Sequence, residues 1–278
     1  MAYKDILVQI DAAAEPARYA VAANLASRGE GRVTGVYLKT TLINQYNSIG
    51  TIGYLPPEDL DRLIQEHNQA QDDDAAKAAA ALTEAAAAAK VDHDWRVIDG
   101  DTPDPLIAQA RRGDLIVLPA PQPSPAYNVH ASAVQVALGG GGPVLIIPSE
   151  GAAKPIGARA LLAWNGSREA ARALRDALPL LSPGATIEVR IARSEEGGDD
   201  DDAALRGHLE SHGFVVNIKV APQDGRHVAA WLRAEAKAAD CDLIVMGLYG
   251  HPRLSEFVLG GVSRDMLHAP SLPLLISH

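Results

Sequence analysis

The chain has 278 residues, of which 47% are hydrophobic and 22% are charged, a composition typical of a globular protein long enough for two packed domains. The formal net charge is −10 and no Lys/Arg cluster stands out, so nucleic acid and anionic membranes are not expected partners. The single cysteine, Cys241, excludes an intrachain disulfide. Because no signal peptide and no long apolar stretch is present, we expect a soluble, cytoplasmic protein.

The chain repeats one order of strands and helices in its two halves. The strands expected in the first half, each with its match in the second, are 5–11 with 159–165, 32–38 with 186–191, 94–98 with 215–220, 114–118 with 242–246, and 143–147 with 273–277. Helical stretches separate them, and strands that alternate with helices predict a parallel sheet with helices on both faces. The Leu-Ile-Val runs lack polar alternation, which indicates strands buried on both sides. The sequence therefore predicts an α/β protein with domains at 1–150 and 157–278, joined by a polar linker.

Three connecting segments receive simple interpretations. A long helix is expected from Pro57 through Ala89, because the segment ends in an alanine run. The acidic run Asp199–Asp202 is interpreted as a solvated loop. Its negative charge would interact favourably with the positive end of the dipole of a following helix. Asp92-His93-Asp94 precedes an expected strand and is interpreted as a turn.

A glycine-rich segment follows the buried strand of the second half, in the position where open parallel sheets bind ligands. Gly247 and Gly250 would let the chain turn sharply and let a ligand approach the backbone. After nine further residues, Gly260 and Gly261 open the last expected helix with no Cβ in the way. Four glycines at this spacing, between a buried strand and a helix, predict a phosphate-binding turn.

The expected helix start supplies the donors that such a turn requires. The backbone N–H groups of Gly261, Val262 and Ser263 would point at an anion, helped by the helix dipole. The Ser263 hydroxyl could add a donor. His251 and Arg253 lie in the preceding loop, from which they could reach a phosphate.

The segment from Gly247 to Ser263 resembles the ATP-binding signature of the universal stress protein family: Gly, two residues, Gly, nine residues, Gly, then Ser or Thr. A short strand that ends in Asp11 or Asn165, and a last strand that follows His268-Ala269-Pro270, agree with this resemblance. The resemblance covers both halves, so the chain is similar to a tandem universal stress protein. It implies two Rossmann-like domains, each a five-stranded parallel sheet with helices on both faces.

The same resemblance implies a stress-response or regulatory protein whose second domain binds ATP, AMP or another adenine nucleotide, with or without Mg²⁺. Ala163, Trp164 and Asn165 would lie at the adenine and ribose. The remaining residues that it assigns are Met246, Gly247, Tyr249 and Gly250 at the ribose and α-phosphate, and Gly260, Gly261, Val262 and Ser263 at the β- and γ-phosphates. Asn165 replaces the usual Asp, and Gly261 replaces the usual Ser or Thr, so we expect weakened binding.

The resemblance also bears on association. Family domains pair through their last strands, which implies that Val144–Ile147 pairs with Leu274–Ile276 in an intrachain pseudo-dimer. Whether two chains then form a homodimer is left open by the sequence.

The first half lacks the features of a phosphate site. Pro119 and Pro121 follow its buried strand and have no N–H groups to offer. The segment that matches the second glycine pair, within His130–Gln135, contains no glycine. The glycine run Gly139–Gly142 leads into a strand and is interpreted as a loose turn.

Other interpretations carry less support. His208 and His212 lie four residues apart on an expected helix but lack further ligands, so no metal site is expected. Ser263, Asp265 and His268 share one helix and do not form a catalytic triad. With no catalytic residue assigned, the expected activity is at most slow ATP hydrolysis. The alternative function is a stress-response scaffold that binds no nucleotide.

Overall fold

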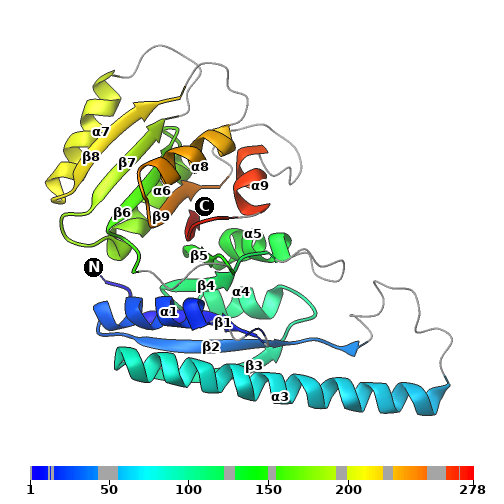
Figure 1. Cartoon of the computed structure of the whole chain (residues 1–278). Coiled ribbons are helices and arrows are strands. Elements are labelled where there is room, and N and C mark those ends of the chain that lie inside the picture. The colour runs from blue at the N-terminus through cyan, green and yellow to red at the C-terminus, as the bar shows by residue number, and fades with distance from the viewer. Residues whose placement is uncertain are drawn as a thin grey trace. The chain divides into compact units, whose positions relative to one another are not determined.

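The computed structural model describes residues 2–11, 13, 16–42, 56–121, 129–149, 155–191, 199–221, 228–248, 261–268 and 270–278 (Figure 1). The chain divides into two compact units, one spanning Tyr3–Gly142 and the other Pro143–His278. Both units consist of strands that alternate with helices, which confirms the α/β class expected from the repeat.

Within its described residues, the first unit has four parallel strands in the order β3-β2-β1-β4. Its elements are β1 (Asp5–Ile10), α1 (Pro16–Arg28), β2 (Arg32–Lys39), α3 (Pro57–Ala89), β3 (Asp92–Asp99), α4 (Asp104–Ala110), β4 (Leu115–Pro119) and α5 (Val129–Gly140). The 33-residue helix α3 has the bounds predicted from the sequence, and it runs beside β2 and β3 (Figure 1). Leu82 of α3 is fully buried, which shows that this helix covers one face of the unit's sheet.

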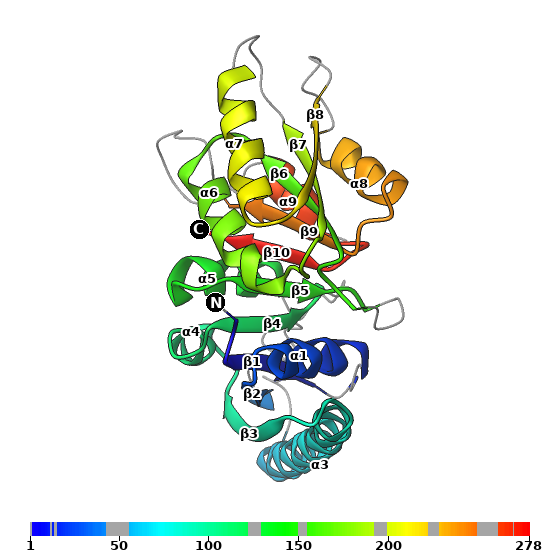
Figure 2. The same cartoon turned by 90° about the vertical axis from the view of Figure 1, so that its left-hand side faces the viewer.

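In the second unit, the part of the chain that the structure describes forms six strands in the order β5-β10-β9-β6-β7-β8. Its elements are β5 (Val144–Ile147), β6 (Arg159–Trp164), α6 (Arg168–Ala177), the short 3₁₀ helix η2 (Leu178–Leu180), β7 (Thr186–Ile191), α7 (Asp199–Ser211), β8 (Val215–Val220), α8 (Val228–Ala238), β9 (Leu243–Gly247), α9 (Gly261–His268) and β10 (Leu274–Ser277). Figure 2 shows α6 and α7 on one side of this sheet and α8 on the other. Five strands therefore come from each half of the chain, as the sequence predicts.

The last strand of the first half belongs to the second unit. β5 pairs antiparallel with β10, with Val144 opposite Ile276 and Ile146 opposite Leu274. This confirms the strand pairing that the family resemblance implies. All other strand pairs of the second unit are parallel. Part of the expected linker, 150–154, lies outside the described residues, so the domain bounds at 150 and 157 stay a prediction.

Three local predictions from the sequence are wrong. Asp92–Asp94 is no turn, because it forms the start of β3 and pairs with the start of β2. Asp199–Asp202 is no loop, because it forms the first turn of α7, where carboxylates interact favourably with the helix dipole. The glycine run is not a loose turn throughout: Gly139 and Gly140 end α5, and Gly141 has a φ of 76°, as is common just after a helix.

The Asp of the repeated Asp-Leu-Ile-Val segment has a structural role. In the second unit, the Asp242 carboxylate accepts hydrogen bonds from the backbone N–H groups of Gly157 at 2.7 Å, Ala158 at 2.9 Å and Arg159 at 3.0 Å. Asp242 directly precedes β9, and Arg159 begins β6. A single carboxylate thus fixes where the two central strands start relative to one another.

The first unit repeats this arrangement with one bond fewer. Asp114 directly precedes β4, and its carboxylate accepts from the N–H groups of Lys4 at 2.8 Å and Asp5 at 3.0 Å. The sequence repeat therefore preserves a backbone contact as well as an apolar strand.

We predict that Asp242→Ala lowers the free energy of unfolding by about 3 kcal/mol, because three N–H groups lose a charged acceptor. Asp114→Ala removes two such bonds and should cost less, about 2 kcal/mol. Urea unfolding followed by circular dichroism measures both. A loss below about 0.5 kcal/mol for Asp242→Ala, the size of an ordinary surface substitution, would contradict this role.

Candidate functional site

The carboxyl ends of three neighbouring strands meet in the second unit. β6, β9 and β10 are parallel, and their register places Ala163 beside Met246 and Met246 beside Ile276. One residue further, Gly247 lies beside Ser277. Because parallel strands end at the same edge, this edge is where a ligand of an open α/β sheet would lie.

A hydrogen-bonded turn joins β6 to α6. The Asn165 Oδ1 accepts from the Ser167 N–H at 3.1 Å and from the Ser167 hydroxyl at 2.7 Å, and Gly166 between them has a φ of 72°. The Ser167 Oγ in turn accepts from the Ala170 N–H at 3.2 Å and caps α6. A backbone N–H can only donate, so the Asn165 oxygen must face Ser167. The exposed Asn165 side chain therefore offers a ligand its amide N–H donors rather than an acceptor.

Gly247 lies where β9 meets the first turn of α6. A Cβ at this position would lie 2.4 Å from the Glu169 carbonyl carbon and 2.5 Å from the Ala170 nitrogen. Both atoms are backbone and cannot move away without shifting the helix. The sequence assigned Gly247 to a sharp turn and a ligand, and the structure adds that it lets α6 pack against the sheet.

The C-terminal residues hold the chain that leaves β9. The Leu248 N–H donates to the Ser277 carbonyl at 2.8 Å, and the His278 Nδ1 lies 3.2 Å from the Leu248 carbonyl. Ser277 is 1% exposed, and its Oγ has no hydrogen-bond partner among the described residues. Sequence reasoning missed Ser277, although a serine that ends an apolar strand is a signal in the printed sequence.

The helix α9 begins at Gly261. A Cβ there would have nothing within 4 Å, so the backbone at the start of the helix lies open. Gly261 and Val262 are exposed and Ser263 is buried. The first N–H groups of any α-helix have no acceptor within the helix, and they carry the positive end of its dipole. From α8, Arg233 donates to the Asp265 carbonyl and so links α8 to α9.

Eight of the predicted site residues are described by the structure: Ala163, Trp164, Asn165, Met246, Gly247, Gly261, Val262 and Ser263. Five lie outside the described residues: Tyr249, Gly250, His251, Arg253 and Gly260. The structure brings Ala163 and Met246 together as strand neighbours. The role of each residue along a bound nucleotide stays a prediction.

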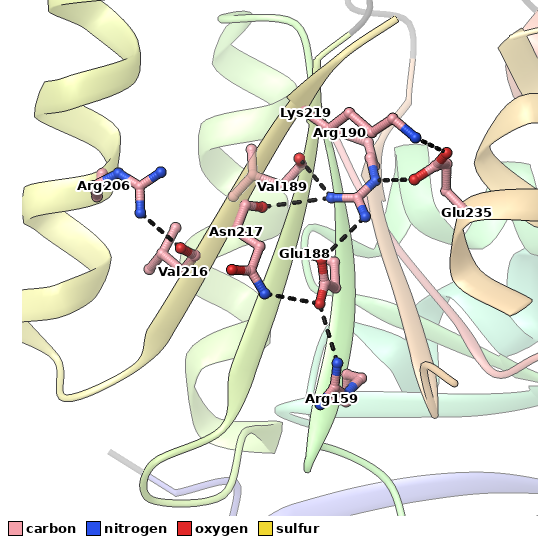
Figure 3. Close-up of polar contacts among 9 residues, drawn as sticks. All are labelled: Arg159, Glu188, Val189, Arg190, Arg206, Val216, Asn217, Lys219 and Glu235. Carbon is pink, nitrogen blue, oxygen red and sulfur yellow. Dashed lines mark hydrogen bonds and ion pairs between the residues drawn. The ribbon is translucent and has the colours of Figure 1, made fainter. Parts of the chain in front are cut away.

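A network of ion pairs lies on one face of the second unit's sheet, the same face as Ala163, which is the register neighbour of Arg190 (Figure 3). Glu188 and Arg190 of β7 are both buried, and the Arg190 Nη2 donates to the Glu188 Oε2 at 3.0 Å. The Arg190 Nε donates to the Glu235 Oε2 of α8 at 2.9 Å. Sequence reasoning missed this network because the contact between Arg190 and Glu235 joins side chains far apart in the chain.

Neighbouring strands complete the network. The remaining Glu188 oxygen accepts from the Arg159 Nη1 at 3.2 Å and from the Asn217 Nδ2 at 3.0 Å, and Lys219 pairs with Glu235. Burial alone would raise the pKa of Glu235, but hydrogen bonds from Lys219 and Arg190 outweigh it, and the pKa is lowered from its usual 4.5. This network holds α8 on the sheet.

Cys241 lies close to this network. Burial, and then the charge of Glu188, raise the pKa of the Cys241 thiol to about 12. The thiolate is the reactive form of cysteine, so Cys241 is an inert packing residue at neutral pH.

In the first unit, the side chain that matches Asn165 has a different environment. The Asp11 Oδ2 accepts from the Arg18 Nη2 at 2.6 Å, and the fully buried Arg18 also donates through its Nε to the Gln9 carbonyl at 3.0 Å. The negative charge of Asp11 is therefore balanced by Arg18 of the same unit. Residues 130–135, expected to lack a phosphate turn, lie inside α5.

The described residues contain no helix long and apolar enough to cross a membrane. Within the same residues, no group of three or more His, Cys, Asp and Glu side chains is arranged to hold a metal ion.

These features define an α/β protein with a mostly parallel sheet. The model of the universal stress protein family matches residues 158–278, and this part of the chain belongs to that family. A search of curated proteins found no match.

Among solved structures, a universal stress protein from Archaeoglobus fulgidus is similar with a TM-score of 0.68 at 14% identity, and the match covers 98% of this chain and 97% of the other. A functionally unknown protein from Pseudomonas aeruginosa matches with a TM-score of 0.55 at 16% identity, covering 99% and 92%. At these identities the likeness shows a shared fold across both halves.

We predict that Gly247→Ala lowers the free energy of unfolding by about 3 kcal/mol, because its Cβ would overlap the α6 backbone. Gly261→Ala is the matched control, because its Cβ meets open space and should leave the stability nearly unchanged. Chemical unfolding of both variants distinguishes them. Equal stability would contradict the close approach at Gly247.

We predict that the stability of the second unit falls in acid. The folded pKa of Glu235 is lowered, so its contribution is present above pH 4.5 and is lost as the pH falls through the folded value. Glu235→Gln should flatten the acid side of the curve of unfolding free energy against pH. Thermal melts from neutral to acidic pH measure this, and identical curves for the two proteins would disprove the linkage.

Proposed function

We propose that the second unit binds ATP, or another adenine nucleotide, at the edge formed by β6, β9, β10 and the start of α9, and that this binding regulates a stress response. The observation that carries the proposal is the open backbone at Gly261, where a helix N-terminus has room for a phosphate. Membership of residues 158–278 in the universal stress protein family supports the stress-response role.

The chemistry of the described residues suits a nucleotide. The N–H groups of Gly261, Val262 and Ser263 would hold phosphate oxygens, and the dipole of α9 favours their negative charge. The exposed Arg264 lies in the same turn and adds a cation. Because the chain carries a net charge of −10, an anion would be held by such local donors rather than by a basic surface. Mg²⁺ would enter with the nucleotide.

The nucleotide would act as a ligand rather than as a substrate. In the described part of α9, Asp265 is the only carboxylate, and its Oδ1 lies 3.7 Å from the Nε of the neighbouring Arg264. No general base is therefore assigned at the γ-phosphate, and we expect at most slow ATP hydrolysis. Regulation would then follow from a difference in nucleotide affinity between conformations or complexes.

One observation favours the rival function, a scaffold that binds no nucleotide. The Asn165 oxygen is already engaged by Ser167, so the end of β6 has lost the acceptor that the family's usual Asp would provide. The two hypotheses differ in whether a nucleotide binds at this strand edge, and direct titration distinguishes them.

We predict micromolar binding of Mg-ATP at about one site per chain in isothermal titration of the nucleotide-stripped protein. Gly261→Val should weaken this binding at least about tenfold, or about 1.4 kcal/mol, because a branched side chain would cover the N–H groups at the helix start. Gly207→Val is the matched control, since Gly207 lies on α7 and a Cβ there also meets open space.

The absence of heat from ATP and AMP at millimolar concentration would refute the nucleotide proposal and favour the scaffold. Equal weakening by both valine variants would show that the effect is not local to α9. Gly260→Val tests the same proposal at the neighbouring glycine, which lies outside the described residues.

A further inference from the structure

The outer strand of the first unit, β3, has an unusually exposed edge. It pairs with β2 on one side and is the last strand of the unit's order. Trp95 is 40% exposed and Val97 is 43% exposed, although both are large hydrophobic side chains. They point to the same face because residues two apart on a strand share a face. On that face Trp95 packs over Gly35, with its Cβ 3.2 Å from the position a Gly35 Cβ would take.

The backbone of β3 offers a donor at this edge. The Trp95 N–H donates to the Asp94 Oδ1 at 2.8 Å rather than to β2. In a strand, the N–H and C=O groups of one residue point to the same side, so both groups of Trp95 point away from β2. An antiparallel strand added at this edge would therefore form its hydrogen bonds at Trp95.

Two opposite charges flank Trp95. Asp94 is 73% exposed, and its Oδ2 lies 3.9 Å from the Arg96 Nη2, which is a long contact for an ion pair. The Arg96 Nη1 donates to the Gln109 Oε1 of α4 at 3.3 Å. Surface ion pairs of this kind contribute little, so both charges can exchange partners at small cost.

The matching strand of the second unit uses these positions differently. Asn217 and Lys219 occupy the places of Asp94 and Arg96 on β8, and they bond inward to Glu188 and Glu235. In the first unit, Thr34 and Val36 are the register neighbours of Asp94 and Arg96 on β2, and neither carries a charge. The two β3 charges consequently stay at the edge.

The sequence around Trp95 is complementary to itself. If two copies of β3 pair antiparallel about a two-fold axis at Trp95, each Trp95 lies opposite the other. Asp94 then lies opposite Arg96 of the second copy, and Arg96 opposite Asp94 of the second copy. A two-fold axis creates each pair twice, as in isologous dimers. Opposite charges and aromatic pairs in such positions stabilise antiparallel strands.

We propose that β3 is a self-association surface, through which two copies of this chain pair antiparallel with Trp95 at the two-fold axis. On pairing, the Trp95 N–H moves from the Asp94 carboxylate to the Trp95 carbonyl of the second copy. The freed Asp94 carboxylate then pairs with Arg96 of the second copy. This surface belongs to the first unit, whereas the proposed nucleotide edge belongs to the second.

Charge reversal tests this register. In sedimentation velocity of the full chain over micromolar to millimolar concentrations, we expect a reversible dimer. Asp94→Arg and Arg96→Asp each place like charges opposite one another and should each weaken the dimer about tenfold or more. The doubly reversed variant, with both substitutions, restores opposite charges and should dimerise like the original chain.

A mixture provides the matched control. Asp94→Arg chains mixed with Arg96→Asp chains bring opposite charges together at both positions, so heterodimers should form although neither variant pairs with itself. Circular dichroism melts verify that each variant is folded. A monomer at all concentrations would overturn the proposal and leave the charges as protection of the edge against pairing. A dimer that ignores the charge reversals would also overturn it, because the interface would then lie elsewhere.

Discussion

The candidate site depends on the hydrogen bonds that the Asp242 carboxylate accepts from backbone N–H groups. By holding the N–H groups of residues 157–159, it fixes the start of β6 against the start of β9. That register carries through to the other end of the strands, where Ala163 lies beside Met246. Gly247 then lets the first turn of α6 approach the end of β9. The Asp242 carboxylate and the absence of a Cβ at Gly247 therefore determine the geometry of the edge at which a ligand would lie.

The sequence predicts the framework well because the framework depends on local patterns. The repeat and the buried strands follow from runs of apolar residues and their order, whereas the pairing of β5 with β10 follows from the resemblance to the universal stress protein family. Among the wrong predictions are those for Asp92–Asp94 and Asp199–Asp202, where polar residues suggest a turn and a loop. At the first place, backbone pairing with β2 outweighs the polarity of the side chains. At the second place, the dipole of α7 favours the carboxylates in its first turn.

Features that depend on contacts between distant residues could not be predicted. Nothing in the sequence around Glu188 shows that it meets Arg159 and Asn217, because the strand register that joins them forms only in the folded sheet. The same holds for Gly247, for which the glycine spacing indicated a ligand while the fold shows a helix backbone. The two halves thus share a fold and differ in chemistry, as Asp11 paired with Arg18 illustrates.

The central claim is that the second unit, and not the first, holds a nucleotide between the end of β6 and the start of α9. Hydrogen–deuterium exchange of the full chain, with and without saturating Mg-ATP, tests this most directly because it reports on the backbone N–H groups that would bind. The account predicts slower exchange confined to peptides covering 163–167 and 261–266. Unchanged exchange throughout, or protection confined to peptides covering 5–11 and 115–121, would contradict it.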